Sequence, residues 1–456
     1  MKKLFLFGLL SSLAFAPTYL VFVLFFTFPF LLENIVESVD KKDVIKKAFA
    51  FGFGYFVGGL YWICSSLLIE PLVYGWLIPF ALILIPGFLS LYIILTCLCT
   101  FYASKKIKNK FIVSLIFAIC WIFFEYLRGK LIIAFPWNII ATTTTFSSYF
   151  MFPVKYFGTE IYGIVLVLLY CFKFYFAENK KISYSFLCCF LTFILYGFFV
   201  INTTKISYLP YNIRLVQPSI PQNLKWDANL SKKNFDELIN LSKSEDIENV
   251  DYFIWAESSI PYIINMKNID NHEIFKYINE NLLHNEKRLI SGFIRVNGDK
   301  YYNSLGVIEG NQLLNYYDKY FLVPFGEYIP LKKYIPFVKK ITEGTVDFSK
   351  GRKQDTIFDG KLPLFSPNIC YESIFKDSIN MQAKLIVSIT NDSWFGNTSG
   401  PYQHFSNLKL RAVENSVPVI RVGNSGISAV IDGFGRVHKK IKLNKKAILD
   451  IKIPLI

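Results

Sequence analysis

The stretch SPNICYE, residues 366–372, places Cys370 directly after a short apolar run that is typical of a buried strand. Two earlier stretches have the same form. FIWAES (253–258) leads to Glu257, and YDKYFLVPFGE (317–327) sets Lys319 in an apolar context. Charged or nucleophilic side chains seldom follow buried strands without a partner or a task. These three stretches therefore predict one polar site built at the strand ends of an α/β domain.

The surrounding half of the chain, from residue 211 onward, alternates short β-rich runs with amphipathic helical runs. This alternation favours a layered α/β domain. No GxGxxG or Walker-type loop follows a predicted strand, so nucleotide binding has no support. The predicted strands are 213–217, 252–255, 288–295, 301–309, 368–371, 385–390, 417–422 and 427–431, and the predicted helices are 231–244, 271–284 and 402–415.

The first half of the chain is far more apolar and holds seven of the eight cysteines. Its longer apolar runs reach the ~20 residues that cross a ~30 Å hydrocarbon core. We predict a transmembrane domain of about seven helices over 1–207, followed by a catalytic domain over 211–456. A cleaved signal peptide over 1–16 is the alternative for the first run. The apolar runs are 4–16, 18–32, 48–68, 77–102, 111–127, 161–177 and 184–201.

Lysines in the connecting loops orient these helices. The loops 33–47, 104–110 and 178–183 are lysine-rich, whereas 69–76 has no Lys or Arg. This alternation predicts a cytoplasmic N-terminus, and seven crossings then place the second domain outside the cytoplasm. The formal net charge of +15 lacks the basic stripe with interleaved aromatics that nucleic-acid binding requires, so we attribute it to anionic membrane lipid.

The three strand-end residues suit acyl transfer to a thiol. A thiol has an ordinary pKa of ~8.5 and needs a base to become a nucleophile at neutral pH. Glu257 can be that base if burial raises its basicity, and Lys319 can stabilise the oxyanion. Each residue alone has an ordinary structural explanation, but the three together predict a catalytic site. The cysteines and histidines show no metal-ligand spacing, so we predict no metal.

The order of Glu257, Lys319 and Cys370 resembles the nitrilase, or carbon–nitrogen hydrolase, superfamily. The flanking segments resemble its apolipoprotein N-acyltransferase branch, and the similarity spans nearly the whole chain. The segments that carry this resemblance are EYLRG (125–129), FPW (135–137), VQPSIPQNLKW (216–226), WAESSIP (255–261), KYFLVPFGEYIP (319–330), CYE (370–372), NDSWFG (391–396), GPYQHF (400–405) and RAVEN (411–415).

The resemblance implies an αββα sandwich on a membrane-helix base, in a bacterial inner membrane with the catalytic domain on the periplasmic side. It implies acyl transfer from a phospholipid to the N-terminal amine of a diacylglyceryl-cysteine in an apolipoprotein, by a ping-pong route through a cysteine thioester and without a cofactor. Cys370 is then the nucleophile, Glu257 the general base and Lys319 the oxyanion stabiliser. The implied supporting residues are Glu327 beside the lysine, Trp226, Tyr371 and Glu372 around the thioester and substrates, and Phe325 and Trp394 in the lipid pocket.

Two other functions are weighed against this one. A membrane-tethered amidase or nitrilase acting on small amides shares the triad but leaves the membrane half without a purpose. A non-catalytic receptor or transporter would usually have lost at least one triad residue, and all three are present. The resemblance also implies a last membrane helix after the catalytic domain. The chain ends at IPLI (453–456) without one, so either the protein lacks that helix or its sequence continues.

Residues 329–348 interleave apolar side chains with lysines and contain two prolines and a glycine that rule out one long helix. We predict a mobile flap on the bilayer surface that covers the acyl chain and excludes water between the two steps. An ordinary packed connection is the alternative.

Overall fold

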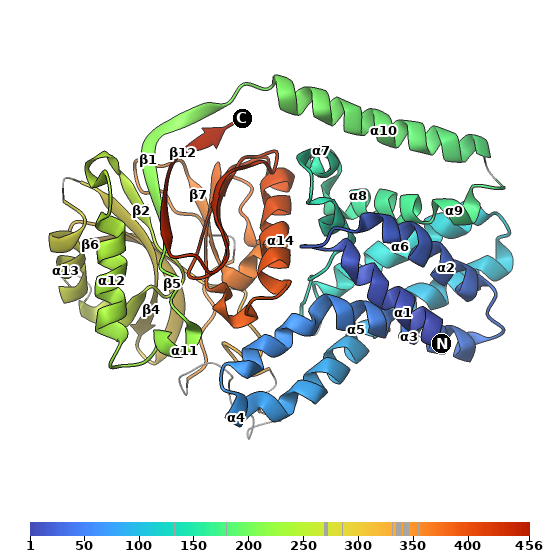
Figure 1. The fold of residues 1–456 in the computed structure, drawn as a ribbon, viewed down its shortest axis with the longest axis horizontal. Coiled ribbons are helices and arrows are strands. Elements are labelled where there is room, and N and C mark those ends of the chain that lie inside the picture. The colour runs from blue at the N-terminus through green and yellow to red at the C-terminus, as the bar shows by residue number, and fades with distance from the viewer. Residues whose placement is uncertain are drawn as a thin grey trace. The chain divides into compact units, whose positions relative to one another are not determined.

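The computed structural model describes residues 1–131, 133–178, 180–268, 272–284, 286–330, 332–333, 340, 346–353 and 355–456. These residues form two compact units, unit 1 from Met1 to Thr204 and unit 2 from Lys205 to Ile456 (Figure 1). Most of the predicted flap lies outside the described residues.

Unit 1 is built from helices throughout its described length. Four helical segments are long and apolar enough to cross a membrane: Lys41–Leu68, Pro71–Lys106, Lys110–Arg128 and Lys180–Thr203. The other apolar runs form shorter helices, so the crossing number of seven stays a prediction. The helices are α1 (Lys2–Ser11), α2 (Leu24–Val36), α3 (Lys41–Leu60), α4 (Pro71–Tyr74), α5 (Ile78–Lys106), α6 (Lys110–Arg128), α7 (Ser148–Met151), α8 (Val154–Tyr170), α9 (Phe172–Tyr175) and α10 (Lys180–Thr203).

Helices α1 and α3 meet backbone to backbone, and two glycines make this possible. A Cβ atom on Gly8 would lie 2.0 Å from the Phe51 carbonyl oxygen, and one on Gly54 would lie 2.2 Å from the Phe5 carbonyl oxygen. Small residues at such crossings let two membrane helices approach closely. The ten-residue helix α1 therefore packs directly on the backbone of α3, and any side chain larger than that of glycine at these two positions would prevent this contact.

Unit 2 contains two sheets. The described strands form a seven-stranded sheet in the order β12-β1-β2-β4-β5-β6, with β3 paired to β4, and a five-stranded sheet in the order β11-β10-β9-β8-β7. The strands are β1 (Ser207–Gln217), β2 (Tyr252–Ile254), β3 (Ile260–Asn265), β4 (Arg288–Asn297), β5 (Lys300–Glu309), β6 (Gln312–Asp318), β7 (Phe365–Ile369), β8 (Leu385–Thr390), β9 (Val419–Gly423), β10 (Ser428–Ile431), β11 (Val437–Ile441) and β12 (Ala447–Leu455).

The two sheets pack face to face around one buried core. Leu215 and Ile254 of the first sheet share this core with Val387 and Ile420 of the second. Helices α12 (Ser231–Lys243) and α13 (Glu273–Asn281) cover the outer face of the first sheet, and α14 (Gly400–Asn415) covers that of the second (Figure 1). The predicted αββα sandwich is thereby confirmed.

Several strand limits differ from the prediction. The predicted strand 368–371 ends at Ile369, because Cys370 turns the backbone into a short 3₁₀ helix, Cys370–Ile374. Four further strands, β3, β6, β11 and β12, were not predicted. The strand β12 pairs antiparallel with β1 along nearly its whole length, so the first and last strands of unit 2 lie side by side.

Candidate active site

Three strand ends of unit 2 bring the predicted triad together. Glu257 lies three residues past β2, whereas Lys319 directly follows β6 and Cys370 directly follows β7. Lys319 Nζ lies 3.3 Å from Glu257 Oε1, and the Cys370 thiol and the Glu257 carboxylate are close enough for each to shift the pKa of the other. The exposed fractions of Glu257, Lys319 and Cys370 are 7%, 1% and 7%. The two sheets therefore place a thiol, a carboxylate and an ammonium group in one buried site.

A second carboxylate, Glu327, completes the surroundings of the lysine. Its Oε1 atom accepts a hydrogen bond from Lys319 Nζ at 2.9 Å, and the Asn303 side chain donates to both Glu257 Oε1 at 2.8 Å and Glu327 Oε1 at 2.9 Å. Backbone N–H groups of Asn391 and Val323 donate to the outer oxygens of the two glutamates, each at 2.8 Å. Hydrogen bonds to both oxygens of each carboxylate thus hold Glu257 and Glu327 in place in the absence of substrate.

The expectation that burial raises the basicity of Glu257 is wrong for this resting site. Burial does act to raise the pKa of Glu257. The Lys319 charge, the Asn303 hydrogen bond, the Lys225 charge and the Cys370 hydrogen bond together outweigh it and hold the pKa below its ordinary value. Burial and the Glu257 charge raise the pKa of Cys370, which the Lys319 charge only partly offsets. The resting proton therefore sits on the thiol.

The pKa shifts of Glu257 and Cys370, together with the charge of Lys319, determine when the thiol proton of Cys370 can move to Glu257. Burial opposes the charge of Lys319, but the charges of Glu327 and Glu257 raise its pKa above its ordinary value, so it stays an ammonium group. Proton transfer from Cys370 to Glu257 is unfavourable in the resting site. It becomes favourable when an oxyanion forms nearby, because Lys319 then shares its charge between the oxyanion and Glu257.

The backbone of Cys370 is held in an unusual conformation. Its φ angle of 53° lies in the left-handed region, which residues other than glycine adopt only when the surrounding structure holds them there. One restraint is a hydrogen bond to the Cys370 carbonyl group: His404 Nε2 lies 2.9 Å from the carbonyl oxygen. Since a carbonyl can only accept, the histidine donates this hydrogen bond.

His404 is itself held by a buried charged pair. Its Nδ1 atom lies 2.8 Å from Asp392 Oδ1, and Arg421 donates to Asp392 Oδ2 at 2.7 Å. Burial acts to raise the pKa of Asp392, but the Arg421 charge and His404 lower it well below its ordinary value. These three fully buried side chains come from the segment after β8, from α14 and from β9. The nucleophile turn is therefore supported by three elements of the second sheet layer.

Glu372 joins the nucleophile turn to the lysine segment. Its Oε1 atom accepts from the Tyr317 hydroxyl at 2.7 Å and from the backbone N–H of Tyr320 at 2.9 Å, and its Oε2 atom accepts from the N–H of Ile369 at 2.8 Å. The side chain is fully buried. Glu372 thus connects residues on either side of Lys319 to the residue before Cys370, and it fixes the spacing between the Lys319 and Cys370 segments.

Comparison with known proteins covers both halves of the chain. Residues 7–172 match the family model described as apolipoprotein N-acyltransferase N-terminal domain, and residues 212–455 match that described as carbon–nitrogen hydrolase. The apolipoprotein N-acyltransferase of Rickettsia typhi is 36% identical over 99% of this chain and 91% of its own length, and that of Brucella melitensis is 31% identical over 99% and 89%. A solved carbon–nitrogen hydrolase superfamily protein from Xanthomonas campestris aligns with 53% of this chain and 90% of its own, at 18% identity and a TM-score of 0.38.

The chain belongs to the apolipoprotein N-acyltransferase family. This membership confirms the resemblance drawn from the motifs, and it identifies the chain as a membrane protein and an acyltransferase.

In this apolipoprotein N-acyltransferase chain, Lys225 is a site residue that motif reasoning missed. Its Nζ atom donates to the Glu257 carbonyl oxygen at 2.8 Å. Burial lowers the pKa of Lys225 to about 8, against the opposing effects of the Glu257 and Cys370 charges. The residue lies inside the quoted motif 216–226, but a lysine next to a tryptophan in a sequence gives no sign of being buried. Only the fold shows that it is buried against Glu257.

The four predicted aromatic residues lie on four separate segments. Tyr371 is buried in the nucleophile turn and packs edge to face on Phe375, with ring centroids 5.1 Å apart. The other three are half-buried: Trp226 at the end of α11 (Gln222–Lys225), Phe325 at a positive φ of 62°, and Trp394 in the turn after β8. Their roles in binding substrate or lipid stay predictions.

Proposed function

We propose that this chain transfers an acyl chain from a membrane phospholipid to the N-terminal amine of a diacylglyceryl-cysteine in bacterial apolipoproteins, through a thioester on Cys370. The single observation that carries the proposal is the buried cluster of Cys370, Glu257 and Lys319 in a chain whose other unit has helices able to cross a membrane. We assign Cys370 as nucleophile, Glu257 as general base and Lys319 as oxyanion stabiliser.

In the first step the Cys370 sulfur attacks the ester carbonyl carbon of the phospholipid. The thiol proton passes to Glu257 as the C–S bond forms, and Lys319 stabilises the negative charge on the carbonyl oxygen. The C–O bond then breaks, Glu257 returns the proton to the leaving oxygen, and a lysophospholipid departs. The acyl group remains on Cys370 as a thioester.

In the second step the neutral amine of the acceptor attacks the thioester carbonyl. Glu257 accepts a proton from the amine, the C–S bond breaks, and the proton returns to the sulfur. The product is an amide, and the enzyme is restored. Splitting the reaction in this way requires that water be excluded while the thioester waits. In this scheme Glu327 and Asn303 keep Lys319 and Glu257 in place through both steps.

We further propose a bacterial inner-membrane location with unit 2 on the periplasmic side. The lysine-rich loops 33–47, 104–110 and 178–183 support a cytoplasmic location for those loops. Trp226, Tyr371, Phe325 and Trp394 are proposed to contact the acyl chain or the acceptor. A phospholipid and a diacylated apolipoprotein are accordingly the proposed substrates.

The test uses the full chain in detergent with phosphatidylethanolamine that carries an isotope-labelled acyl chain. We expect peptide mass spectrometry to find the label on Cys370, and a synthetic diacylglyceryl-cysteine peptide to remove it as an amide. The same lipopeptide with an acetylated amine is the control acceptor and should leave the thioester in place. Equal release of free fatty acid with both acceptors, or hydrolysis of small amides without transfer, would instead establish a hydrolase.

A further inference from the structure

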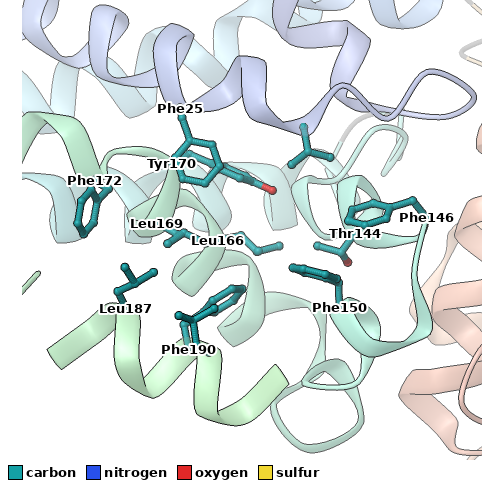
Figure 2. Close-up of a pocket in the computed structure, with 12 residues that line it drawn as sticks. Phe25, Thr144, Phe146, Phe150, Leu166, Leu169, Tyr170, Phe172, Leu187 and Phe190 are labelled. Carbon is teal, nitrogen blue, oxygen red and sulfur yellow. The ribbon is translucent and has the colours of Figure 1, made fainter. Parts of the chain in front are cut away.

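An apolar groove lies within unit 1, between α10 and the helices beside it (Figure 2). Its volume is about 300 Å³. Phe25, Leu166 and Leu169 line one side, and Leu187 and Phe190 of α10 line the other. The two polar side chains of the lining are already satisfied, since Thr144 donates to the Ala141 carbonyl and the Tyr170 hydroxyl pairs with Thr143. The groove therefore offers only hydrocarbon contacts to an occupant.

Helix α10 contacts its neighbours on both sides of the groove. Near its start, Tyr184 packs on Phe176 with ring centroids 5.4 Å apart. Farther along, Phe193 packs on Phe157 with ring centroids 5.1 Å apart, and a Cβ atom on Gly197 would lie 2.7 Å from the ring of Phe152. Nine residues separate Tyr184 from Phe193, which is roughly 14 Å of helix at 1.5 Å per residue. Leu187 and Phe190 lie within that interval.

The surroundings of the groove indicate what fills it. Helix α10 is one of the segments able to cross a membrane, and only 17% of its most apolar stretch is buried within the protein. Leu191, which also lines the groove, is half exposed. A groove beside such a helix would open on lipid in a membrane, and an empty gap would forfeit the packing contacts of its lining.

The size of the groove suits a slim hydrocarbon chain. Its volume of about 300 Å³ is about twice that of an apolar cavity of ~150 Å³ that binds benzene. One leaflet is about half of the ~30 Å hydrocarbon core, which is close to the length of α10 between Tyr184 and Phe193.

One end of the groove carries positive charge. Lys180 precedes Leu187 by seven residues, which places both on the same face of α10 about 10 Å apart. Lys173 directly follows Phe172, another lining residue. Within the described part of the chain, no ion pair engages either lysine. Both are exposed, and both lie where the phosphate of a lipid in the groove would emerge.

We propose that the α8–α10 groove binds one acyl chain of an anionic phospholipid whose headgroup contacts Lys173 and Lys180. This lipid is a resident of unit 1 and is not the acyl donor of the proposed reaction. It holds α10, the helix that leads into β1, against its neighbours. The proposal does not depend on the proposed function, because every residue that carries it lies in unit 1.

The test places the full chain in nanodiscs of phosphatidylcholine with a minor fraction of phosphatidylglycerol that bears a photoreactive diazirine in mid-chain. We expect crosslinks to concentrate on residues 187–191 and 166–172. Leu187→Trp, which fills the groove, should reduce these crosslinks several-fold. Cys189→Trp is the matched control, since this exposed residue lies about 200° around the helix from Leu187 and should change nothing.

Further variants test the headgroup contact and the occupancy of the groove separately. Lys173→Gln with Lys180→Gln should abolish the preference for phosphatidylglycerol over a phosphatidylcholine probe of the same chain while leaving the crosslinked positions unchanged. Leu187→Met keeps an apolar chain of similar size and should retain crosslinking, which guards against a variant that merely misfolds. Uniform labelling around α10, unaffected by Leu187→Trp, would mean ordinary surrounding lipid and would overturn the proposal.

Discussion

Glu257 carries its negative charge in the resting site, and this charge both serves and hinders the nucleophile. It raises the pKa of Cys370, yet in the proposed mechanism it also receives the thiol proton. A base whose pKa lies below its ordinary value is a weak one until the oxyanion forms. We therefore expect the Cys370 thiol to become reactive only in the complex with substrate and to stay protonated in the free enzyme.

This arrangement predicts opposite effects of Glu257→Gln on two reactions of Cys370. Acylation by phospholipid should fall by about 10²–10⁴-fold, the usual contribution of a general base. Alkylation of Cys370 by iodoacetamide at neutral pH should instead become faster, because the charge that raises the thiol pKa has been removed. Peptide mass spectrometry distinguishes Cys370 from the other seven cysteines. Slower alkylation would show that Glu257 activates the resting thiol as well.

Lys225 predicts an alkaline increase in the rate of the reaction. Its pKa is lowered to about 8, so the charge by which it helps to lower the pKa of Glu257 is present below that pH and lost above it. Glu257 then becomes a stronger base, and the acylation rate should increase as pH rises through about 8. Lys225→Arg, which remains charged, should remove this increase, whereas Lys225→Met should keep the higher rate on both sides of pH 8. A profile unchanged by either substitution would exclude a role for the lysine.

In the turn after β7, neighbouring secondary-structure elements hold the backbone of one residue, Cys370, in place. Its left-handed residue, the donor from α14 and the carboxylate Glu372 together hold Cys370 without touching its sulfur. The Cys370 sulfur, the proposed nucleophile, is therefore positioned by its own backbone, so residues that never meet the substrate should affect the rate.

His404 gives the direct test of this view. His404→Phe keeps a planar ring but leaves the Cys370 carbonyl without its donor, and acylation should fall while the KM for phospholipid stays near the wild-type value. His404→Gln retains an N–H that can reach the same carbonyl and should restore part of the rate. The loss of one buried hydrogen bond costs about 1–3 kcal/mol. Equal losses of rate and of thermal stability in both variants would indicate a purely structural residue.

Asp392 predicts a pH dependence of stability. Its pKa in the folded protein is lowered by Arg421 and His404 against burial. The stabilisation is therefore complete above the unfolded value of ~3.9 and is lost as pH falls through the lower folded value. Asp392→Asn should reduce the melting temperature of the full chain at neutral pH, and the difference from wild type should shrink under acid conditions. A constant difference across pH would contradict the ionised pair.

The sequence pattern predicted the strands that are strongly apolar and missed strands that contain both apolar and polar residues. The strand β8 is uniformly buried and its limits were predicted correctly, whereas β6 alternates exposed and partly buried residues and β12 contains charges. The proximity of Glu257, Lys319 and Cys370 could be expected because Glu257 and Cys370 directly follow apolar runs and Lys319 lies in an apolar context, while their catalytic roles stay predictions. The positive φ at Cys370 and the burial of Lys225 could not, because both depend on segments more than 30 residues away.

The two units have separate cores, and this predicts independent loss of structure. Ile453 in β12 is fully buried in the sandwich core, so Ile453→Asp places an unpaired charge there, a change that usually costs several kcal/mol. We expect unit 2 to become protease-sensitive while the helices of unit 1 remain inserted. Ile456→Asp, at an exposed position three residues on, is the control and should leave both units intact. Simultaneous loss of both units in Ile453→Asp would show that unit 1 depends on unit 2.

The pairing of β12 with β1 has a consequence for how the protein is made. Strand β1 begins at Ser207 and its partner ends at Leu455, a separation of 248 residues from the difference of these numbers. At ribosomal speeds of roughly 5–20 residues per second, this strand waits on the order of 12–50 s for its partner. During that interval its open edge can pair with other chains. Nascent unit 2 is therefore exposed to aggregation until the last strand arrives, and a chaperone that shields extended edges would help most at this stage.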